Sequence, residues 1–523
     1  MGNSNRFVTK VALIVALGGF LMGFDASVIS GVNKFIQVEF ELSDLELGLA
    51  VSSLSFAATV AMLLSGPLSD RFGRKKILSL AAILYGISAI GSALAPNFTF
   101  LVIARMLGGL GVGASLIIAP MYIAEIAPAK QRGRLVSFNQ LNIVIGISAA
   151  FFSNYIILKL GQSNAGWAQA LNFESWNWRW MLGVETLPAI MYFFGLFIVP
   201  RSPRWLLMHN YTDEAEGVMS KALGAENAAL EIQKINASIH SESKKEKSKI
   251  SELFKPAMKL VLLIGIVIGV LQQITGINSV FFYAPMIFEQ SGIGTDASFI
   301  QAIFVGIINL VFTLLAIYYI DKIGRKPLLI IGVTGIAISM LVLSYGFNAA
   351  SYTLEESSLS SLPSAIPTEQ LQSMVGQTYN SDLTYKQALI SNLGQETVKV
   401  YESALISNAA NINSILILIC ILGFVASFAI SVGPVMWVLF SELFPNKIRG
   451  LAISFVGLIN SLVATGVTFI FPWELQNLGS SITFLIYGVF AVLGLIFIIK
   501  VVPETKGKSL EELEQFLVKD NKA

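Results

Sequence analysis

The sequence predicts an all-α membrane protein with twelve transmembrane helices in two bundles of six, and three observations support this fold class. The composition is apolar: 54% of the 523 residues are hydrophobic and 13% are charged, whereas about 25% charged residues are usual in soluble proteins. Apolar runs of membrane-spanning length recur about twelve times. Two charged motifs occur once in each half, which indicates a duplicated bundle.

The apolar runs are spread along the whole chain. Their approximate centres lie near residues 20, 56, 86, 110, 147, 189, 268, 308, 337, 425, 460 and 490. The first run follows Arg6 and Lys10, as in a signal peptide, but no small-residue cleavage site follows, so we expect a retained helix. Because Cys420 is the one cysteine, an intrachain disulfide is excluded.

Basic short loops alternate with loops that lack Lys and Arg. The basic loops contain Arg71 to Lys76, Lys130 to Arg134 and Lys322 to Lys326, whereas the loop at 161–176 contains neither residue type. Since positively charged loops stay on the cytoplasmic side, both termini are expected in the cytoplasm.

Two longer loops divide the chain. We expect a bundle at 1–200, a cytoplasmic helical linker at 201–256, a second bundle at 257–501 and a cytoplasmic tail at 502–523. The linker is basic at Lys244, Lys245, Lys247 and Lys249, and 213–223 and 225–239 are expected to form surface helices. The Ser-rich loop 348–411, between spans nine and ten, is expected to cover the outer side and to be partly helical from Leu383 to Leu405.

The repeated motifs have a fixed order. DRFGRKK at 70–76 recurs as DKIGRKP at 321–327, an offset of 251 residues, and EIAPAKQRG at 125–133 recurs as ELFPNKIRG at 442–450, an offset of 317. The larger offset reflects the long loop that only the second half contains. Two parallel six-helix halves are an architecture of secondary transporters.

We interpret the motif charges as gates at the cytoplasmic helix ends. We expect Asp70 to pair with Arg132, and Asp321 with Arg449, so that the cytoplasmic side is held closed while the outer side is open. The gating set is Asp70, Arg74, Glu125, Arg132, Asp321, Arg325, Glu442 and Arg449. Ordinary positive loops with helix caps are the alternative, which the matching positions in both halves disfavour.

Further motifs extend this series along nearly the whole chain. They are Gly23 to Asp25 with Val28 to Gly31, Gly66 to Lys76, Arg105 with Gly108, Gly111 and Gly113, Pro120 to Gly133 with Gln140, Trp178 to Trp180, Pro200 to Arg204, Gln272 and Gln273 with Gly276 and Asn278, Gly433 and Pro434 with Trp437, and Pro503 to Thr505. This ordered series resembles the sugar porter family of the major facilitator superfamily. The resemblance implies the major facilitator fold and a sugar carrier, and the pattern is most similar to the proton-coupled members.

Several spans contain side chains suited to a neutral sugar. Each sugar hydroxyl donates and accepts a hydrogen bond, so Gln and Asn amides beside an aromatic face suit it. The resemblance implies sugar binding by Gln140, Gln272, Gln273, Asn278, Asn309, Gly433, Trp437 and Asn460. Gln272 and Asn278 would lie about 120° apart on a straight helix, so we expect a helix break at Gly276. For any single amide, an interhelical hydrogen bond is the alternative.

Three positions depart from the family pattern. Ser461 stands where members commonly carry Trp, Phe282 where a proton-coupled member has Tyr, and Arg201 where the usual Pro-Glu-Ser-Pro-Arg motif has Glu. These departures affect the second aromatic wall of the site, one hydroxyl near the sugar and one cytoplasmic gate contact.

Three charged residues are predicted to share one depth in the membrane. A charged side chain at the centre of a span costs about 2.5–3.5 kcal/mol, so Asp25 is interpreted as functional. Helix rise places Asp25 about 21 Å into a core of about 30 Å, level with Arg105 and Glu185. An Arg that moves toward or away from Asp25 would switch it between the proton-bound and the free form. The resemblance also implies proton coupling, since facilitative members have Asn at this position; a static buried ion pair is the alternative.

We therefore predict a secondary active transporter that imports a monosaccharide, a hexose or a pentose, with a proton by alternating access. A facilitative uniporter is the nearest alternative, and a non-transporting sugar sensor is disfavoured by the short tail after Val502. No enzyme is expected, because His209 and His240 both fall in the linker and no nucleophile–base pair or metal cluster appears within the spans. We expect no cofactor and, at a net charge of +2, no nucleic-acid partner. The resemblance favours a functional monomer in a bacterial inner membrane.

Overall fold

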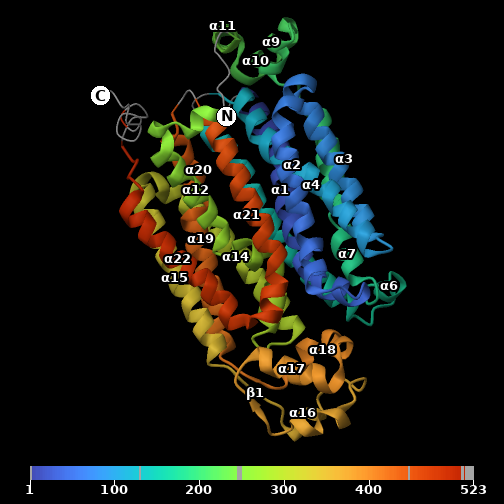
Figure 1. Ribbon diagram of the computed structural model, residues 1–523. Helices are drawn as coiled ribbons and strands as arrows, with labels where there is room; N and C mark the ends of the chain where they lie inside the picture. Colours follow the sequence, from blue (N-terminus) through green and yellow to red (C-terminus); the bar gives the residue numbers. More distant parts are fainter. Residues whose placement is uncertain (1–2, 129–130, 244–249, 446–447, 508–511, 513–523) are drawn as a thin grey trace. The chain divides into compact units, whose positions relative to one another are not determined.

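The computed structural model describes residues 3–128, 131–243, 250–445, 448–507 and 512 (Figure 1). Within these ranges, twelve segments are helical, long and apolar enough to cross a membrane. Each predicted span centre falls in a different one of them, which confirms the predicted fold class. Lys130, Lys244, Lys245, Lys247, Lys249 and most of the predicted tail lie outside the described residues.

Among the described residues up to 243, every regular element is an α-helix. These helices are α1 (Asn3–Glu39), α2 (Asp44–Phe72), α3 (Arg74–Ala93), α4 (Phe98–Ile126), α5 (Arg132–Gly161), α6 (Gly166–Ala170), α7 (Asn177–Gly183), α8 (Thr186–Ile198), α9 (Pro203–Met208), α10 (Thr212–Leu223) and α11 (Ala225–Ser243). Helices α10 and α11 confirm the two surface helices predicted for the linker.

The second half repeats the six spans and adds a small domain. Its elements are η1 (Ile250–Phe254), η2 (Pro256–Met258), α12 (Lys259–Ile274), α13 (Ile277–Glu289), α14 (Thr295–Ile323), α15 (Arg325–Asn348), β1 (Ser351–Thr353), α16 (Glu356–Leu359), η3 (Thr368–Met374), β2 (Thr378–Tyr379), α17 (Asp382–Leu393), α18 (Gln395–Ser407), β3 (Ala410–Asn411), α19 (Ser414–Ile430), α20 (Val432–Leu443), α21 (Arg449–Asn477) and α22 (Gly479–Val501).

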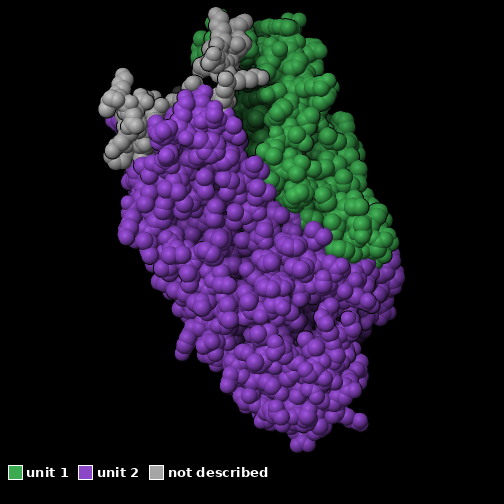
Figure 2. All heavy atoms as spheres, viewed as in Figure 1, with its two compact units in different colours: residues 1–28, 53–153, 179–249 green, residues 29–52, 154–178, 250–523 purple. Residues whose placement is uncertain are grey.

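The chain forms two compact units (Figure 2). Unit 1 comprises residues 1–28, 53–153 and 179–249, and unit 2 comprises residues 29–52, 154–178 and 250–523. The units therefore do not follow a single cut at residue 200, because segments 29–52 and 154–178 of the first half pack with the second. Lys34, for example, forms an ion pair of 3.0 Å with Glu289 inside unit 2.

Glycines let neighbouring helices of unit 1 approach at backbone distance. A Cβ added at Gly109 of α4 would lie 2.2 Å from the carbonyl oxygen of Leu54, and one added at Gly113 would lie 2.1 Å from that of Ala58. Small residues spaced in this way are common where membrane helices pack closely. The glycine motif of α4 therefore holds this helix against α2.

Three spans are each built from two helices. Span six consists of α7 and α8, span seven of α12 and α13, and span ten of α19 and α20. Gly276 separates α12 from α13 with a φ of +87°, a conformation that suits glycine, and an added Cβ would lie 2.4 Å from the ring of Tyr487. This geometry confirms the predicted break. Discontinuous spans are typical of binding sites in secondary transporters.

Residues 351–411 form a small domain, here called the loop domain, at one end of unit 2 (Figure 1). Its strand β1 pairs antiparallel with β2 and with β3, and its core includes Tyr352 stacked on Tyr385 at a ring-centroid distance of 5.4 Å. Helices α17 and α18 confirm the predicted helical stretch. The strands were not predicted, because they have only two or three residues each.

The loop domain is fixed by charged contacts within unit 2. Asp382 caps α22 by accepting a hydrogen bond of 2.8 Å from the backbone N–H of Ser480. Lys386 and Glu402 form a 2.7 Å ion pair inside the domain. Burial opposes the charged form of Lys386, but the nearby carboxylates of Glu402, Asp382 and Asp44 together raise the pKa of Lys386. In turn, burial opposes the charged form of Glu402, but Lys386 and Gln290 together lower the pKa of Glu402.

Candidate functional site

Unit 1 contains a buried acidic cluster. Asp25 on α1 and Arg105 on α4 are each 1% exposed, and Nη1 of Arg105 lies 3.4 Å from Oδ1 of Asp25. Glu185, 2% exposed, lies at the break between α7 and α8 and is within electrostatic reach of both. The structure thus brings together the three charged residues that the depth estimate placed at one level.

Each carboxyl group of this cluster has a buried oxygen that can take a proton. Arg105 engages one oxygen of Asp25, while Oδ2 of Asp25 and Oε1 of Glu185 have no hydrogen-bond partner in the described part of the chain. An unpaired buried oxygen is costly on a charged carboxylate, and protonation removes that cost. The arrangement is therefore chemically suited to binding and releasing a proton.

The backbone of α4 makes room for the Asp25 carboxyl group. A Cβ added at Gly108 would lie 2.8 Å from Oδ2 of Asp25 and 2.5 Å from Oγ of Ser88. Tyr85, fully buried on α3, is also within electrostatic reach of Asp25 and Glu185. Sequence reasoning missed Tyr85 and Ser88, because a buried polar residue beside a carboxylate has the same helical spacing as an ordinary core residue.

Unit 2 contains four amides that bond to one another. Gln273 donates to Gln272 at 3.1 Å and to Asn460 at 3.3 Å, Asn278 donates to Gln273 at 3.0 Å, and Asn460 donates to Gln272 at 2.9 Å. Gln272 and Asn460 are buried, whereas Gln273 and Asn278 are partly exposed. The break at Gly276 allows α12 and α13 to contribute to one network.

The other predicted sugar residues lie in different surroundings. The carbonyl group of Gly433, in the first turn of α20, accepts a hydrogen bond of 3.3 Å from Gln272. Trp437, one turn further along α20, is 42% exposed and packs edge-on against Phe440. Asn309 of α14 is buried, and no hydrogen bond among the described residues joins it to the four amides. Gln140 is exposed on α5 in unit 1, and its part in sugar binding stays a prediction.

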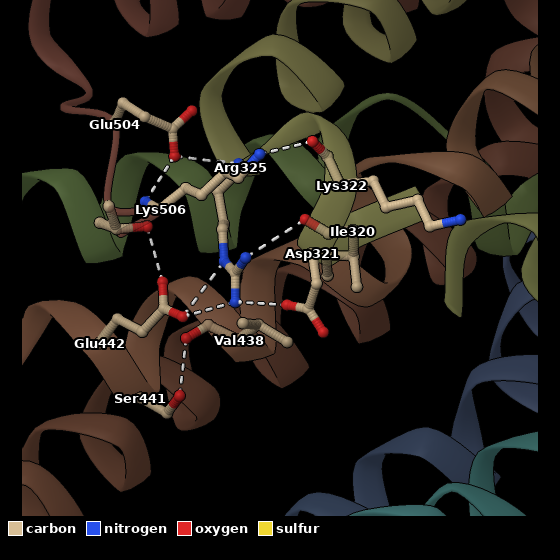
Figure 3. A network of polar contacts seen from close by, with 10 residues as sticks. Ile320, Asp321, Lys322, Arg325, Val438, Ser441, Glu442, Glu504 and Lys506 are labelled. Atoms are coloured by element: carbon tan, nitrogen blue, oxygen red, sulfur yellow. Dashed lines mark hydrogen bonds and ion pairs between the residues drawn. The ribbon is translucent and has the colours of Figure 1, made fainter. Parts of the chain in front are cut away.

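The motif charges form one arginine cluster in each unit. Arg74 pairs with Asp70 at 2.9 Å and with Glu125 at 3.0 Å. Arg325 pairs with Asp321 at 3.1 Å and with Glu442 at 2.8 Å, as Figure 3 shows. The two clusters therefore have the same construction, with a guanidinium between two carboxylates.

In this structure, each aspartate pairs with the arginine of its own motif, and the pairing of Asp70 with Arg132 and of Asp321 with Arg449 stays a prediction for the state that is open to the outside. Among the described residues, no ion pair joins Asp70 to Arg132 or Asp321 to Arg449; Arg132 is exposed at the start of α5, and Arg449 donates to the carbonyl oxygen of Phe444 at 3.0 Å. The physical reason is local. Each aspartate lies four residues before the arginine of its own motif, so that guanidinium is the nearest partner.

A hydroxyl group completes each cluster. Ser202 donates to Glu125 in unit 1, and Thr505 donates to Glu442 at 2.6 Å in unit 2. Sequence reasoning did not assign these residues a role. The available signal was the repeated pattern of Pro, any residue, and Ser or Thr, at 200–202 and at 503–505.

Comparison with known proteins identifies the family. The model of the family described as "Sugar (and other) transporter" matches residues 11–364 and 394–517. The chain belongs to the sugar transporter family. This result confirms the resemblance to the sugar porters of the major facilitator superfamily, a family of transporters and not of enzymes.

The sugar transporter relatives match over nearly their full length. An arabinose-proton symporter from Bacillus subtilis is 34% identical, covering 99% of this chain and 96% of the relative. A D-xylose-proton symporter from Escherichia coli K12 is 35% identical, covering 98% and 96%. The solved inward open conformation of the E. coli xylose transporter XylE has a TM-score of 0.73 at 34% identity, covering 98% of this chain and all of that one. These bacterial relatives support sugar transport across a membrane.

We predict that Gly108→Ala destabilises unit 1. The new methyl group would lie 2.5–2.8 Å from Ser88 and Asp25, and such overpacking costs about 1–3 kcal/mol. Thermal unfolding of the purified protein in detergent should therefore show a Tm lower by a few degrees. Gly86→Ala is the matched control, because an added Cβ at Gly86 meets no heavy atom within 4 Å. Equal Tm values for the two variants would contradict the close approach of Asp25 to α4.

Proposed function

We propose that this chain imports a monosaccharide together with a proton by alternating access. The observation that carries the proposal is the buried Asp25–Arg105 pair, in which one carboxyl oxygen is held by the guanidinium and the other has no hydrogen-bond partner among the described residues. Protonation of Asp25 weakens its attraction to Arg105, so the proton and the position of the arginine are linked. This linkage, in a member of the sugar transporter family, supports symport.

The sugar would exchange hydrogen bonds with the four amides of unit 2. Gln272, Gln273, Asn278 and Asn460 are joined by four hydrogen bonds, and a sugar hydroxyl can replace either a donor or an acceptor in such a bond. The partly exposed Gln273 and Asn278 would contact the sugar first, and the buried Gln272 and Asn460 would orient them. Gln140, Asn309, Gly433 and Trp437 complete the proposed sugar set. The names of the relatives, which include arabinose, D-xylose and glucose, support a pentose or a hexose.

We expect Gln273→Ala to weaken sugar binding by about tenfold. This side chain donates hydrogen bonds to Gln272 and Asn460 and accepts one from Asn278. Sugar hydroxyls that replace these partners would each contribute about 0.5–1.5 kcal/mol to sugar binding, which the alanine variant loses. Titration calorimetry on purified protein with D-xylose, L-arabinose and D-glucose would measure the change and identify the preferred sugar. Asn477→Ala, which removes an exposed amide at the end of α21, is the control. Unchanged affinity in Gln273→Ala would exclude the amide network as the sugar site.

Asp25→Asn should separate sugar movement from the proton. Asn keeps the size of the side chain but does not titrate, so uphill accumulation driven by a pH gradient should vanish while sugar exchange continues. Both can be measured in proteoliposomes with radiolabelled sugar. Gradient-driven accumulation that survives in Asp25→Asn would remove Asp25 from the coupling mechanism. If the parent protein exchanges sugar but never accumulates it, the protein is a facilitative carrier and the Asp25–Arg105 pair is structural.

We infer that polar contacts at the two ends of the spans act as gates. In unit 2, Lys34 bonds to Glu289 and Thr295, and Lys159 pairs with Asp296 at 2.5 Å, so segments 29–52 and 154–178 are tied to α13 and α14. We assign these contacts to the outer gate in its closed form. The arginine clusters, with Glu125 and Glu442, would set the stability of the opposite, cytoplasmic gate.

Loosening the two gates should shift the conformational balance in opposite directions. Asp70→Asn with Asp321→Asn removes one carboxylate from each arginine cluster and should favour the inward-facing state. Lys34→Ala removes contacts of the outer gate and should favour the outward-facing state. Labelling of single engineered cysteines at either end, in a Cys420→Ser background, would report both shifts. Equal labelling in all variants would show that these charges do not gate transport.

We also propose the orientation and the cellular setting. The basic loops favour a cytoplasmic location for both termini, and the bacterial relatives favour an inner membrane. A single copy contains the complete acidic cluster and the complete amide network, which supports a functional monomer.

A further inference from the structure

Helices α3 and α15 begin within the repeated motifs 70–76 and 321–327, and matching contacts hold the first turns of these two helices. Lys75 in α3 donates to the carbonyl oxygen of Phe197 at 3.3 Å, and Lys326 in α15 donates to that of Ile499 at 2.9 Å. Together with the two arginine clusters and their hydroxyl groups, this lysine contact gives three matched interactions. Corresponding residues of the two units can therefore be compared directly.

One pair of corresponding residues differs between the units: unit 2 has the acidic Glu504 where unit 1 has the basic Arg201. In unit 2, the two carboxylate oxygens of Glu504 accept hydrogen bonds of 3.1 Å, one from the backbone N–H group of Arg325 and one from that of Lys326. Figure 3 shows the contact between Glu504 and Arg325. Glu504 thereby places an anion on the first N–H groups of α15, which have no intrahelical acceptor. In unit 1, the corresponding residue is Arg201, which cannot accept a hydrogen bond.

The corresponding N–H groups of α3 have no carboxylate of this kind. Within the described chain, no side chain caps α3, which begins after Gly73. Arg201 instead points its charge at Glu214 of α10, with which it forms an ion pair. The first N–H groups of α15 therefore bind a carboxylate in unit 2, whereas those of α3 bind no carboxylate among the described residues of unit 1.

A cavity of about 690 Å³ lies at this place. Its polar lining includes Lys75, Lys76, Arg201 and Glu214, a net charge of +2, while the charge of Arg74 is already matched by Asp70 and Glu125. Its apolar lining includes Leu80, Ile83, Phe197 and Ile198, all of them between 43% and 66% exposed. The cavity therefore joins a cationic end to an apolar surface of membrane-spanning helices.

We propose that this cavity binds a phosphate group, and that an acidic phospholipid supplies it. The phosphate would take the place that Glu504 occupies in unit 2, on the N–H groups of α3, with Lys75, Lys76 and Arg201 around it. The acyl chains would lie along Leu80, Ile83, Phe197 and Ile198. Free inorganic phosphate could make the same polar contacts as the lipid headgroup, but it has no acyl chain to bury against the apolar residues of the cavity. A phospholipid is therefore the favoured ligand.

Native mass spectrometry of the full chain in detergent tests the proposal. Phosphatidylglycerol should be retained in preference to phosphatidylcholine of the same acyl length. Arg201→Glu replaces the arginine with the residue type of unit 2, which can cap α3 from within the chain. It should therefore lower phosphatidylglycerol retention by about tenfold or more, since two charges change near an anionic headgroup.

Two controls keep the outcome interpretable. Lys221→Glu makes the same charge change on the exposed face of α10 and should leave retention unchanged. Lys75→Gln with Lys76→Gln should weaken retention without altering residue 201, which covers the case that Arg201→Glu fails to fold. If soluble phosphate competes and no lipid preference is seen, the site holds free phosphate. Equal retention in the parent, Arg201→Glu and the lysine double variant, or no binding of either ligand, would overturn the proposal.

Discussion

The Asp25–Arg105 pair is the interaction on which the rest of unit 1 depends. Two opposite charges at 1% exposure are stable only if their surroundings compensate for the lost hydration. The close packing of the helices around this pair provides such surroundings. Gly108 leaves space for the carboxyl group of Asp25, and Gly109 and Gly113 of α4 allow the backbone of α2 to approach closely. A buried pair of this kind tolerates few arrangements. It is therefore suited to a switch between discrete states, which alternating access requires.

The two units have different polar groups at the centres of their spans. Unit 1 concentrates ionisable groups, with Asp25, Arg105 and Glu185 on three spans, whereas unit 2 concentrates neutral amides around the break at Gly276. Their arginine clusters nevertheless match contact by contact, from Arg74 and Arg325 to the hydroxyl groups that complete each cluster. The contacts at the helix ends are thus alike in the two halves, whereas the span centres differ: unit 1 has ionisable groups there and unit 2 has hydrogen-bonded amides.

The fold followed from the sequence because lipid imposes a strong constraint on length and polarity. Every span centre and the helices of the linker were predictable, and the break at Gly276 followed from the wide angle between Gln272 and Asn278. The ion-pair partners of the motif residues were less predictable. Motif spacing indicates where charges lie, but not that Arg74 would reach Asp70 before Arg132 does. The strands of the loop domain, two or three residues long, carry no periodic signal.

The loop domain has its own core, and its described anchors all lie in unit 2: Asp382 on Ser480, Lys399 on the carbonyl oxygen of Leu42, and Glu402 beside Gln290. A folded domain that is fixed to one unit in this way is a suitable epitope for an antibody fragment. An antibody fragment raised against the loop domain would add asymmetric mass to the protein, and such mass allows small membrane proteins to be aligned in electron micrographs.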